Sequence, residues 1–101
     1  MLPRTLNFES MAQAFMSLVE ERYPTAERVL SLAKKLGIEN DIRAQIIVFS
    51  QFRDAVRGVA RDQIYRSVQH RDEVFNAIIE ALEQLEDELE ELENAEEAEE
   101  E

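Results

Sequence analysis

The sequence predicts an all-α protein, a small antiparallel bundle of four main helices and one short one, on three observations. The 101 residues include two glycines and two prolines, fewer than the turns of a β-sandwich or α/β fold need. Apolar residues recur at helical spacing, and capping residues precede the periodic segments. The length is that of one domain with a modest core. We expect a single helical domain over 1–93 and a disordered acidic tail over 94–101.

The first helix is expected over residues 8–22. Asn7 precedes it, and its side-chain oxygen can accept one of the unpaired backbone N–H groups of the first turn. Its apolar face contains Phe8, Met11, Ala12, Phe15, Met16, Leu18 and Val19. The helix should end at Tyr23, because Pro24 disfavours the α conformation in the residue before it.

The second helix should begin after Thr25, a favourable N-cap residue, and end at Gly37. Lys34 and Lys35 lie in its last turn, where positive charge suits the helix dipole. Its buried stripe is predicted to contain Val29, Leu32, Ala33 and Leu36.

The third helix is predicted to be the central and most buried one. Asn40 or Asp41 can cap its start, and Gly58 marks its end. The apolar stripe comprises Ile42, Ile46, Ile47, Val48, Phe49, Phe52 and Val56. Polar residues between them recur in helical rather than alternating phase, which excludes a strand. Residues 59–66 are expected to form a short helix or a turn.

A long last helix should run from about Ser67 to about Leu92. Its apolar seam has spacings of 3, 4, 3, 4 and 3 and consists of Phe75, Ile78, Leu82, Leu85, Leu89 and Leu92. The part from Phe75 to Leu82 is expected to pack on the chain's own bundle. The outer leucines, Leu85, Leu89 and Leu92, either rest on the bundle as well or project from it and contact a partner.

Glutamates flank this seam, so a parallel pair of copies would bring like charges together. The pattern therefore favours a different partner, apolar with basic flanks.

The charge is −12 and is unevenly distributed. Residues 1–72 have eleven Lys and Arg against nine Asp and Glu, whereas residues 73–101 have fourteen acids and no base. This balance argues against binding to nucleic acids or anionic membranes, which need a basic surface. The sequence has no cysteine, no apolar run of membrane-spanning length and no apolar core of a signal peptide at its start.

Catalytic residues are not indicated. His70 is the only histidine and is expected at the surface. The chain lacks G-x-S-x-G, G-x-G-x-x-G, P-loop and calcium-loop motifs. We therefore predict no enzymatic activity, no cofactor and no metal site.

Five arginines follow one another toward the end of the third predicted helix and beyond it. Arg53, Arg57 and Arg61 are spaced four residues apart, and Arg66 and Arg71 follow. The favoured interpretation is a solvated face whose charges pair locally, for example with Asp54. The alternative is a docking surface for an acidic partner or for the chain's own tail.

Several stretches, in order, resemble the TyeA-type domain of type III secretion gatekeepers, a group that includes YopN/TyeA and SepL/InvE-like proteins. They are MAQAFMSLVEERYP, AERVLSLAKKLGI, IVFSQFRDAV and FNAIIEALEQLEDELEELE, which together cover about residues 8–93. None of them is a catalytic motif. The resemblance rests on the order and spacing of these patterns.

The resemblance implies a helical X-bundle in the bacterial cytoplasm, at the base of the secretion apparatus. Such a domain binds a YopN-like gatekeeper or is fused to it as its last domain. It thereby holds back effector export and orders translocators before effectors. Further partners would be the export apparatus and translocator–chaperone complexes. The lead-in MLPRTLNFES resembles the approach to the domain in fused gatekeepers, so the chain is expected to be either a separate protein or an excised domain.

In the same family the partner contact uses apolar residues of the first helix. The matching positions are Met11 and Phe15, with Phe8 just before them. Together with the outer leucines Leu85, Leu89 and Leu92, they form the predicted partner-binding set. Two alternatives remain open at this point. One is a self-assembling helical or coiled-coil structural protein, and the other is an acidic type III secretion chaperone.

Overall fold

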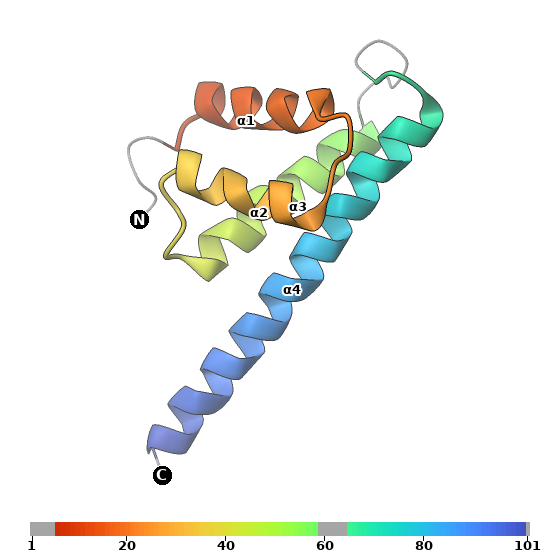
Figure 1. The fold of residues 1–101 in the computed structure, drawn as a ribbon. Helices are drawn as coiled ribbons and strands as arrows, with labels where there is room; N and C mark the ends of the chain where they lie inside the picture. Colours follow the sequence, from red (N-terminus) through yellow and green to blue (C-terminus); the bar gives the residue numbers. More distant parts are fainter. Residues whose placement is uncertain (1–5, 59–64, 101) are drawn as a thin grey trace.

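The computed structural model describes residues 6–58 and 65–100, with side chains described through Arg57 and from Tyr65 to Glu96. These residues form four α-helices and no strand, as the sequence predicts (Figure 1). The helices are α1 (Phe8–Glu20), α2 (Ala26–Lys35), α3 (Ile42–Gly58) and α4 (Val68–Glu100). The short helix or turn expected over 59–66 lies mostly outside the described residues.

Helix α1 begins with a reciprocal capping box. The Asn7 side-chain oxygen accepts the Ser10 backbone N–H at 2.9 Å, and the Ser10 hydroxyl oxygen accepts the Asn7 N–H at 3.0 Å. The helix ends at Glu20, two residues earlier than expected, because Glu21 already has extended backbone angles ahead of Pro24. The predicted cap is therefore confirmed, and the predicted end is slightly too late.

Helix α2 ends in a Schellman motif, which explains the glycine that follows it. Gly37 has a φ of 71°, in the left-handed region that favours glycine. The Ile38 N–H donates to the Ala33 carbonyl at 2.9 Å, and the Gly37 N–H donates to the Lys34 carbonyl at 3.1 Å. Ile38 is buried, so the same turn also adds a side chain to the core.

Helix α3 is capped by Asp41, one of the two predicted candidates, whose carboxylate accepts the Ala44 N–H at 3.0 Å. Two residues of this helix differ from expectation. Ile47, predicted in the buried stripe, is 53% exposed because it lies on the face opposite Phe49 and Phe52. Gln45, one of the polar residues between the stripe positions, is nevertheless buried, and its amide donates to two backbone carbonyls of the preceding loop.

The core is one continuous apolar cluster to which all four helices contribute. Its largest fully buried side chains include Phe49 of α3, Leu18 of α1, Leu36 after α2 and Ile78 of α4. An edge-to-face pair of rings, Phe15 and Phe52, joins α1 to α3 with centroids 5.5 Å apart.

Helix α4 extends further than the sequence predicts. It begins after Ser67, whose hydroxyl accepts the His70 N–H at 3.0 Å, and it continues to Glu100 instead of ending near Leu92. The structure describes residues 94–100 as helix, and the expectation of a disordered tail over 94–101 stays a prediction. The helix has a local reason, since glutamate and alanine favour helical backbone even without an apolar face to bury.

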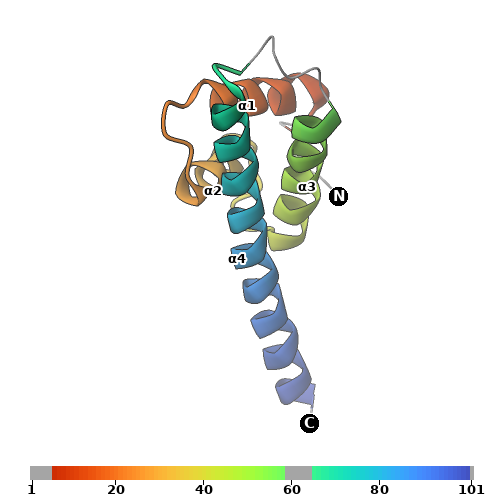
Figure 2. The ribbon, with the colours of Figure 1, turned by 90° about the vertical axis from the view of Figure 1, so that its right-hand side faces the viewer.

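The arrangement leaves the C-terminal half of α4 without a helix packed along it. Helices α3 and α4 lie side by side and run in opposite directions, while α1 and α2 cover the first half of α4 (Figures 1 and 2). The second half projects away from the other three helices (Figure 2). The molecule is accordingly elongated, with extents of 53 × 28 × 21 Å.

Candidate partner-binding surfaces

The first candidate surface lies on α1. Phe8 is 87% exposed, so its ring contributes nothing to the core. Met11 and Phe15 are half-buried and pack against the core cluster, with Phe15 held by its edge-to-face contact with Phe52. The three predicted contact residues of this helix therefore differ in availability, and Phe8 is the most accessible of them.

Next to this buried edge, α1 has an exposed apolar strip. Phe8, Ala12 and Met16 are spaced four residues apart, which aligns them along one side of the helix, and all three are exposed. A strip of this kind is available for a partner without any rearrangement of the core.

The second candidate surface, the outer part of the α4 seam, is only partly available. Leu85 is 2% exposed and belongs to the core, so of the two alternatives it rests on the bundle and is not accessible to a partner in this structure. The reason is that α3 reaches along α4 as far as this turn of the helix. Leu89 is half-buried, and Leu92 is 48% exposed. The seam therefore passes from core to surface within two turns.

An ion pair links the start of α3 to the outer part of α4. The Arg43 guanidinium lies 3.8 Å from a Glu93 carboxylate oxygen, and both side chains are more than half exposed. A pair this exposed contributes little to stability, typically about 0–1 kcal/mol.

The two candidate surfaces do not adjoin. Helix α1 lies at one end of the molecule and the C-terminal end of α4 at the other (Figure 1). One small ligand cannot touch both at once, so they are separate sites.

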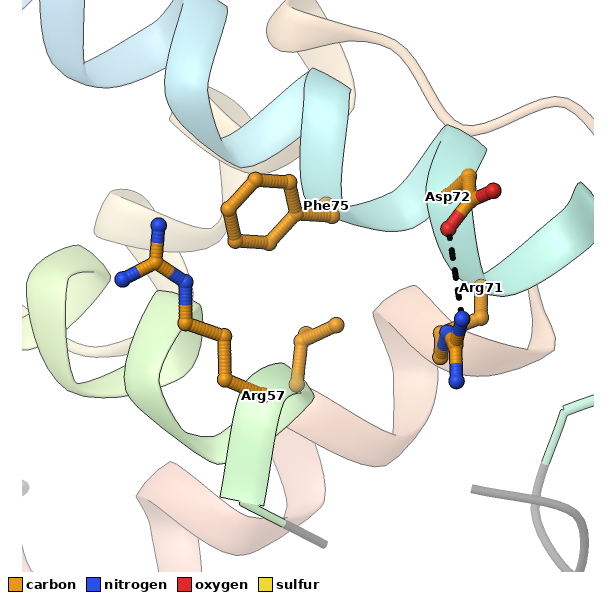
Figure 3. Close-up of a pocket in the computed structure, with 5 residues that line it drawn as sticks. Arg57, Arg71, Asp72 and Phe75 are labelled. Atoms are coloured by element: carbon orange, nitrogen blue, oxygen red, sulfur yellow. Dashed lines mark ion pairs between the residues drawn. The ribbon is translucent and has the colours of Figure 1, made fainter. Parts of the chain in front are cut away.

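A third feature, not expected as a unit, is a hollow between the end of α3 and the start of α4. It has a volume of about 370 Å³ and is lined by Val56, Arg57, Arg71, Asp72 and Phe75. The Arg57 guanidinium carbon lies 5.1 Å from the centroid of the Phe75 ring, a cation–π distance. Figure 3 shows Arg57 reaching from α3 toward this ring on α4, with Arg71 and Asp72 on the far side.

The five arginines predicted to form a solvated face or a docking surface have separate local contacts where the structure describes them. Arg53 and Arg71 each pair with the aspartate that follows them, at 3.4 Å and 3.6 Å. Arg66 instead donates to the Glu20 carbonyl at the end of α1, at 3.2 Å. Arg57 contacts an aromatic ring, and Arg61 lies outside the described residues. Pairing with a neighbouring carboxylate thus accounts for two of the five arginines.

His70 is buried, which corrects the expectation of a surface histidine. It is 4% exposed, and its Nε2 atom lies 2.8 Å from the Val19 carbonyl oxygen. The sequence spacing could have indicated this burial. Val74, Ala77 and Ala81 follow His70 at 4, 7 and 11 residues, which places all four on one face of the helix, and all are buried. The histidine is a structural link between α1 and α4.

Tyr65 is a second polar residue in the interior. It is 7% exposed, and its hydroxyl has no hydrogen-bond partner in the described part of the chain. Burial raises the pKa of this phenol above its ordinary value of 10.0, and the positive charge of Arg71 partly opposes that rise.

Metal chemistry finds no support in the described residues, which contain no group of three or more His, Asp or Glu side chains placed to hold an ion. A second hollow, about 420 Å³, lies between the start of α2 and the middle of α4. Its lining includes three glutamates, Glu27, Glu73 and Glu80, and no basic side chain.

Comparison with known protein families connects this chain with type III secretion. Residues 1–83 match the family model described as "T3SS, Low calcium response E, third helical domain", where T3SS denotes the type III secretion system. No curated protein and no solved structure matches the chain significantly. Among the described residues, no helix has both the length and the apolar character that crossing a membrane requires. The TyeA-type assignment is finer than this match and stays a prediction.

Proposed function

Because the chain belongs to the family of third helical domains of type III secretion low calcium response E proteins, we propose that it is a non-enzymatic regulatory module of a secretion gatekeeper. The observation that carries the proposal is the extent of the match, which spans α1, α2, α3 and the packed half of α4. The matched range thus includes every residue of the core cluster except Leu85.

The module would act by binding. In the proposed mechanism, the α1 strip contacts a YopN-like gatekeeper chain, or an adjoining part of the same gatekeeper if the domain is fused to it. The assembled gatekeeper holds back effectors and lets translocators pass first. The export apparatus and translocator–chaperone complexes would be further partners, and the site of action would be the bacterial cytoplasm at the base of the apparatus.

The exposure of Phe8 supports the choice of α1 as the contact. A phenyl ring that is 87% exposed costs free energy in water, and covering it against a partner recovers roughly 1.5–3 kcal/mol. Aromatic side chains also dominate the energetics of protein interfaces. Met11 and Phe15, half-buried beside it, would form the edge of the same contact.

The alternative of a secretion chaperone is less well supported. The chaperones in question are mixed α/β dimers, whereas the described residues of this chain are helical and contain no strand. Self-assembly through the heptad seam is also disfavoured, because Leu85 is already covered by the chain's own core.

The proposal is tested by isothermal titration calorimetry, in which the protein is titrated into a YopN-like gatekeeper chain. We expect Phe8→Asp to abolish binding while leaving the melting temperature unchanged, because the ring makes no core contact. The matched control is Ile47→Asp, which places the same charge at an exposed apolar position on α3.

In a secreting strain, Phe8→Asp should release effectors before host contact, and Ile47→Asp should not. Normal effector retention in a strain that lacks the protein altogether would contradict the gatekeeper role. Equal losses of binding in the two variants would contradict the contact through α1 and would leave the gatekeeper role untouched.

A further inference from the structure

The hollow at the end of α3 combines an aromatic ring with two arginine side chains. Its floor is apolar, formed by Val56 and the ring of Phe75, and two guanidinium groups border it (Figure 3). Val56 is buried and Phe75 half-buried, so the floor is anchored in the core. In a chain of net charge −12, this is a local concentration of positive charge.

The two arginines of this hollow have different partners. Arg71 pairs with Asp72, which also lines the hollow, at 3.6 Å. Arg57 has no carboxylate within 4.0 Å in the described part of the chain, and its guanidinium lies over the Phe75 ring. Stacking on a ring leaves the in-plane N–H groups of a guanidinium free, and those groups bind carboxylates with two parallel hydrogen bonds.

We propose that this hollow binds an acidic amphipathic segment of another protein, with a carboxylate on Arg57 and an apolar side chain against Val56 and Phe75. The inference concerns a different face from the α1 strip and does not depend on the proposed function.

The chemistry of the lining favours a carboxylate over a phosphate. Asp72 adds a negative charge to the rim, which repels a doubly charged phosphate more than a singly charged carboxylate. The apolar floor also needs an apolar group to cover it, and an amphipathic peptide provides both groups at once.

The chain's own acidic end cannot fill the hollow. Phe75 and Glu93 are 18 residues apart on one continuous helix, a separation of about 27 Å at 1.5 Å per residue. The C-terminal end of α4 points away from the end of α3, where the hollow lies (Figure 2). A second copy is disfavoured as well, because two chains of charge −12 repel each other.

The test uses a synthetic helix-forming peptide of about 15 residues, with leucine at heptad positions a and d, two glutamates beside them, and alanine and glutamine elsewhere, so that its own charge is small. Binding to the intact protein is measured by fluorescence anisotropy at physiological salt. Arg57→Gln should raise Kd about tenfold or more. Arg53→Gln is the matched control, since it removes the same charge one turn earlier on α3 from an arginine that already pairs with Asp54.

Two further peptides separate the contributions. Replacing the leucines by serine keeps the charge, and replacing the glutamates by glutamine keeps the apolar seam; each should bind at least about tenfold more weakly. Equal effects of Arg53→Gln and Arg57→Gln would overturn the proposal, because they would indicate diffuse charge attraction. Undiminished binding of the serine peptide would also overturn it.

Sedimentation of the protein without peptide completes the test. A concentration-independent monomer is expected. Self-association that disappears in Arg57→Gln would overturn the assignment to another protein, because the occupant would then be a second copy of the chain.

Discussion

The side chain of His70 joins the first turn of α4 to the last turn of α1, with Nε2 lying 2.8 Å from the Val19 carbonyl oxygen. The last carbonyls of a helix have no partner within the helix. Here two donors from the start of the α4 region supply partners, since Arg66 donates to the next carbonyl, that of Glu20, at 3.2 Å. A side chain 51 positions later in the sequence thereby completes the backbone hydrogen bonding of α1.

We expect His70→Ala to lower the free energy of unfolding by about 1–3 kcal/mol, because it leaves the buried Val19 carbonyl without a donor. Urea unfolding followed by circular dichroism measures this. Gln69→Ala, an exposed neighbour on the same helix, is the control and should change little. An unchanged unfolding midpoint for His70→Ala would show that the hydrogen bond carries no net stability.

Phe52→Ala should cost about 3–5 kcal/mol, as expected for the loss of a large buried ring. Phe52 is 4% exposed and contacts two other rings, those of Phe15 and Phe49, with centroids 5.5 Å and 5.8 Å away. Ile47→Ala on the solvent face of the same helix should change stability by less than about 0.5 kcal/mol. Similar losses in the two variants would mean that the faces of α3 are assigned wrongly.

Tyr65→Phe should leave stability at pH 7 unchanged or raise it by up to about 1 kcal/mol, because the hydroxyl it removes is buried and unpaired. Its effect on the pH dependence has a definite sign. Burial raises the pKa of the Tyr65 phenol above 10.0 in the folded state. As far as this group is concerned, the protein therefore keeps its full stability below pH 10 and loses stability as the pH rises through the folded pKa, because the unfolded chain releases the phenol proton more readily.

Thermal melts between pH 9 and pH 11 test this second effect. The wild-type protein should lose more stability over that range than Tyr65→Phe does. Tyr23→Phe, at a 69% exposed position, should follow the wild-type profile. Parallel profiles for wild type and Tyr65→Phe would refute the buried state of Tyr65.

The outer seam of α4 gives a graded prediction. Leu85→Ala should cost about 2–5 kcal/mol, because the side chain is fully buried. Leu92→Ala should cost less than about 1 kcal/mol, because its side chain is 48% exposed and the helix continues on either side of it. Chemical unfolding of both variants measures the difference. A large loss for Leu92→Ala would indicate that the projecting half of α4 packs on a second chain in solution.

Local signals in the sequence predict the helices and most of their ends. Asn7, Thr25 and Asp41 each accept a backbone N–H at a helix start, and Gly37 has the left-handed conformation that ends α2. These features depend on a few neighbouring residues, so spacing and residue type are enough to find them.

The interior polar groups could not be predicted in the same way. Gln45, His70 and Tyr65 are polar residues of the interior. His70, expected at the surface, is buried where α1 brings the Val19 carbonyl near, and the Gln45 amide is paired with carbonyls of the preceding loop. The hollow around Arg57 has the same origin, since Phe75 of α4 meets it only through the antiparallel packing of α3 and α4. Sequence periodicity describes single helices and carries no information on which side chains of two helices come into contact.

The projecting half of α4 has a consequence for any hydrodynamic measurement. The radius of gyration is 14.7 Å. A compact domain of about 100 residues has roughly 13 Å. A rod-like extension slows diffusion without adding mass, so this monomer should elute early from a gel-filtration column calibrated with spherical standards. Light scattering or equilibrium sedimentation, which report mass independently of shape, will distinguish a single elongated chain from a true dimer.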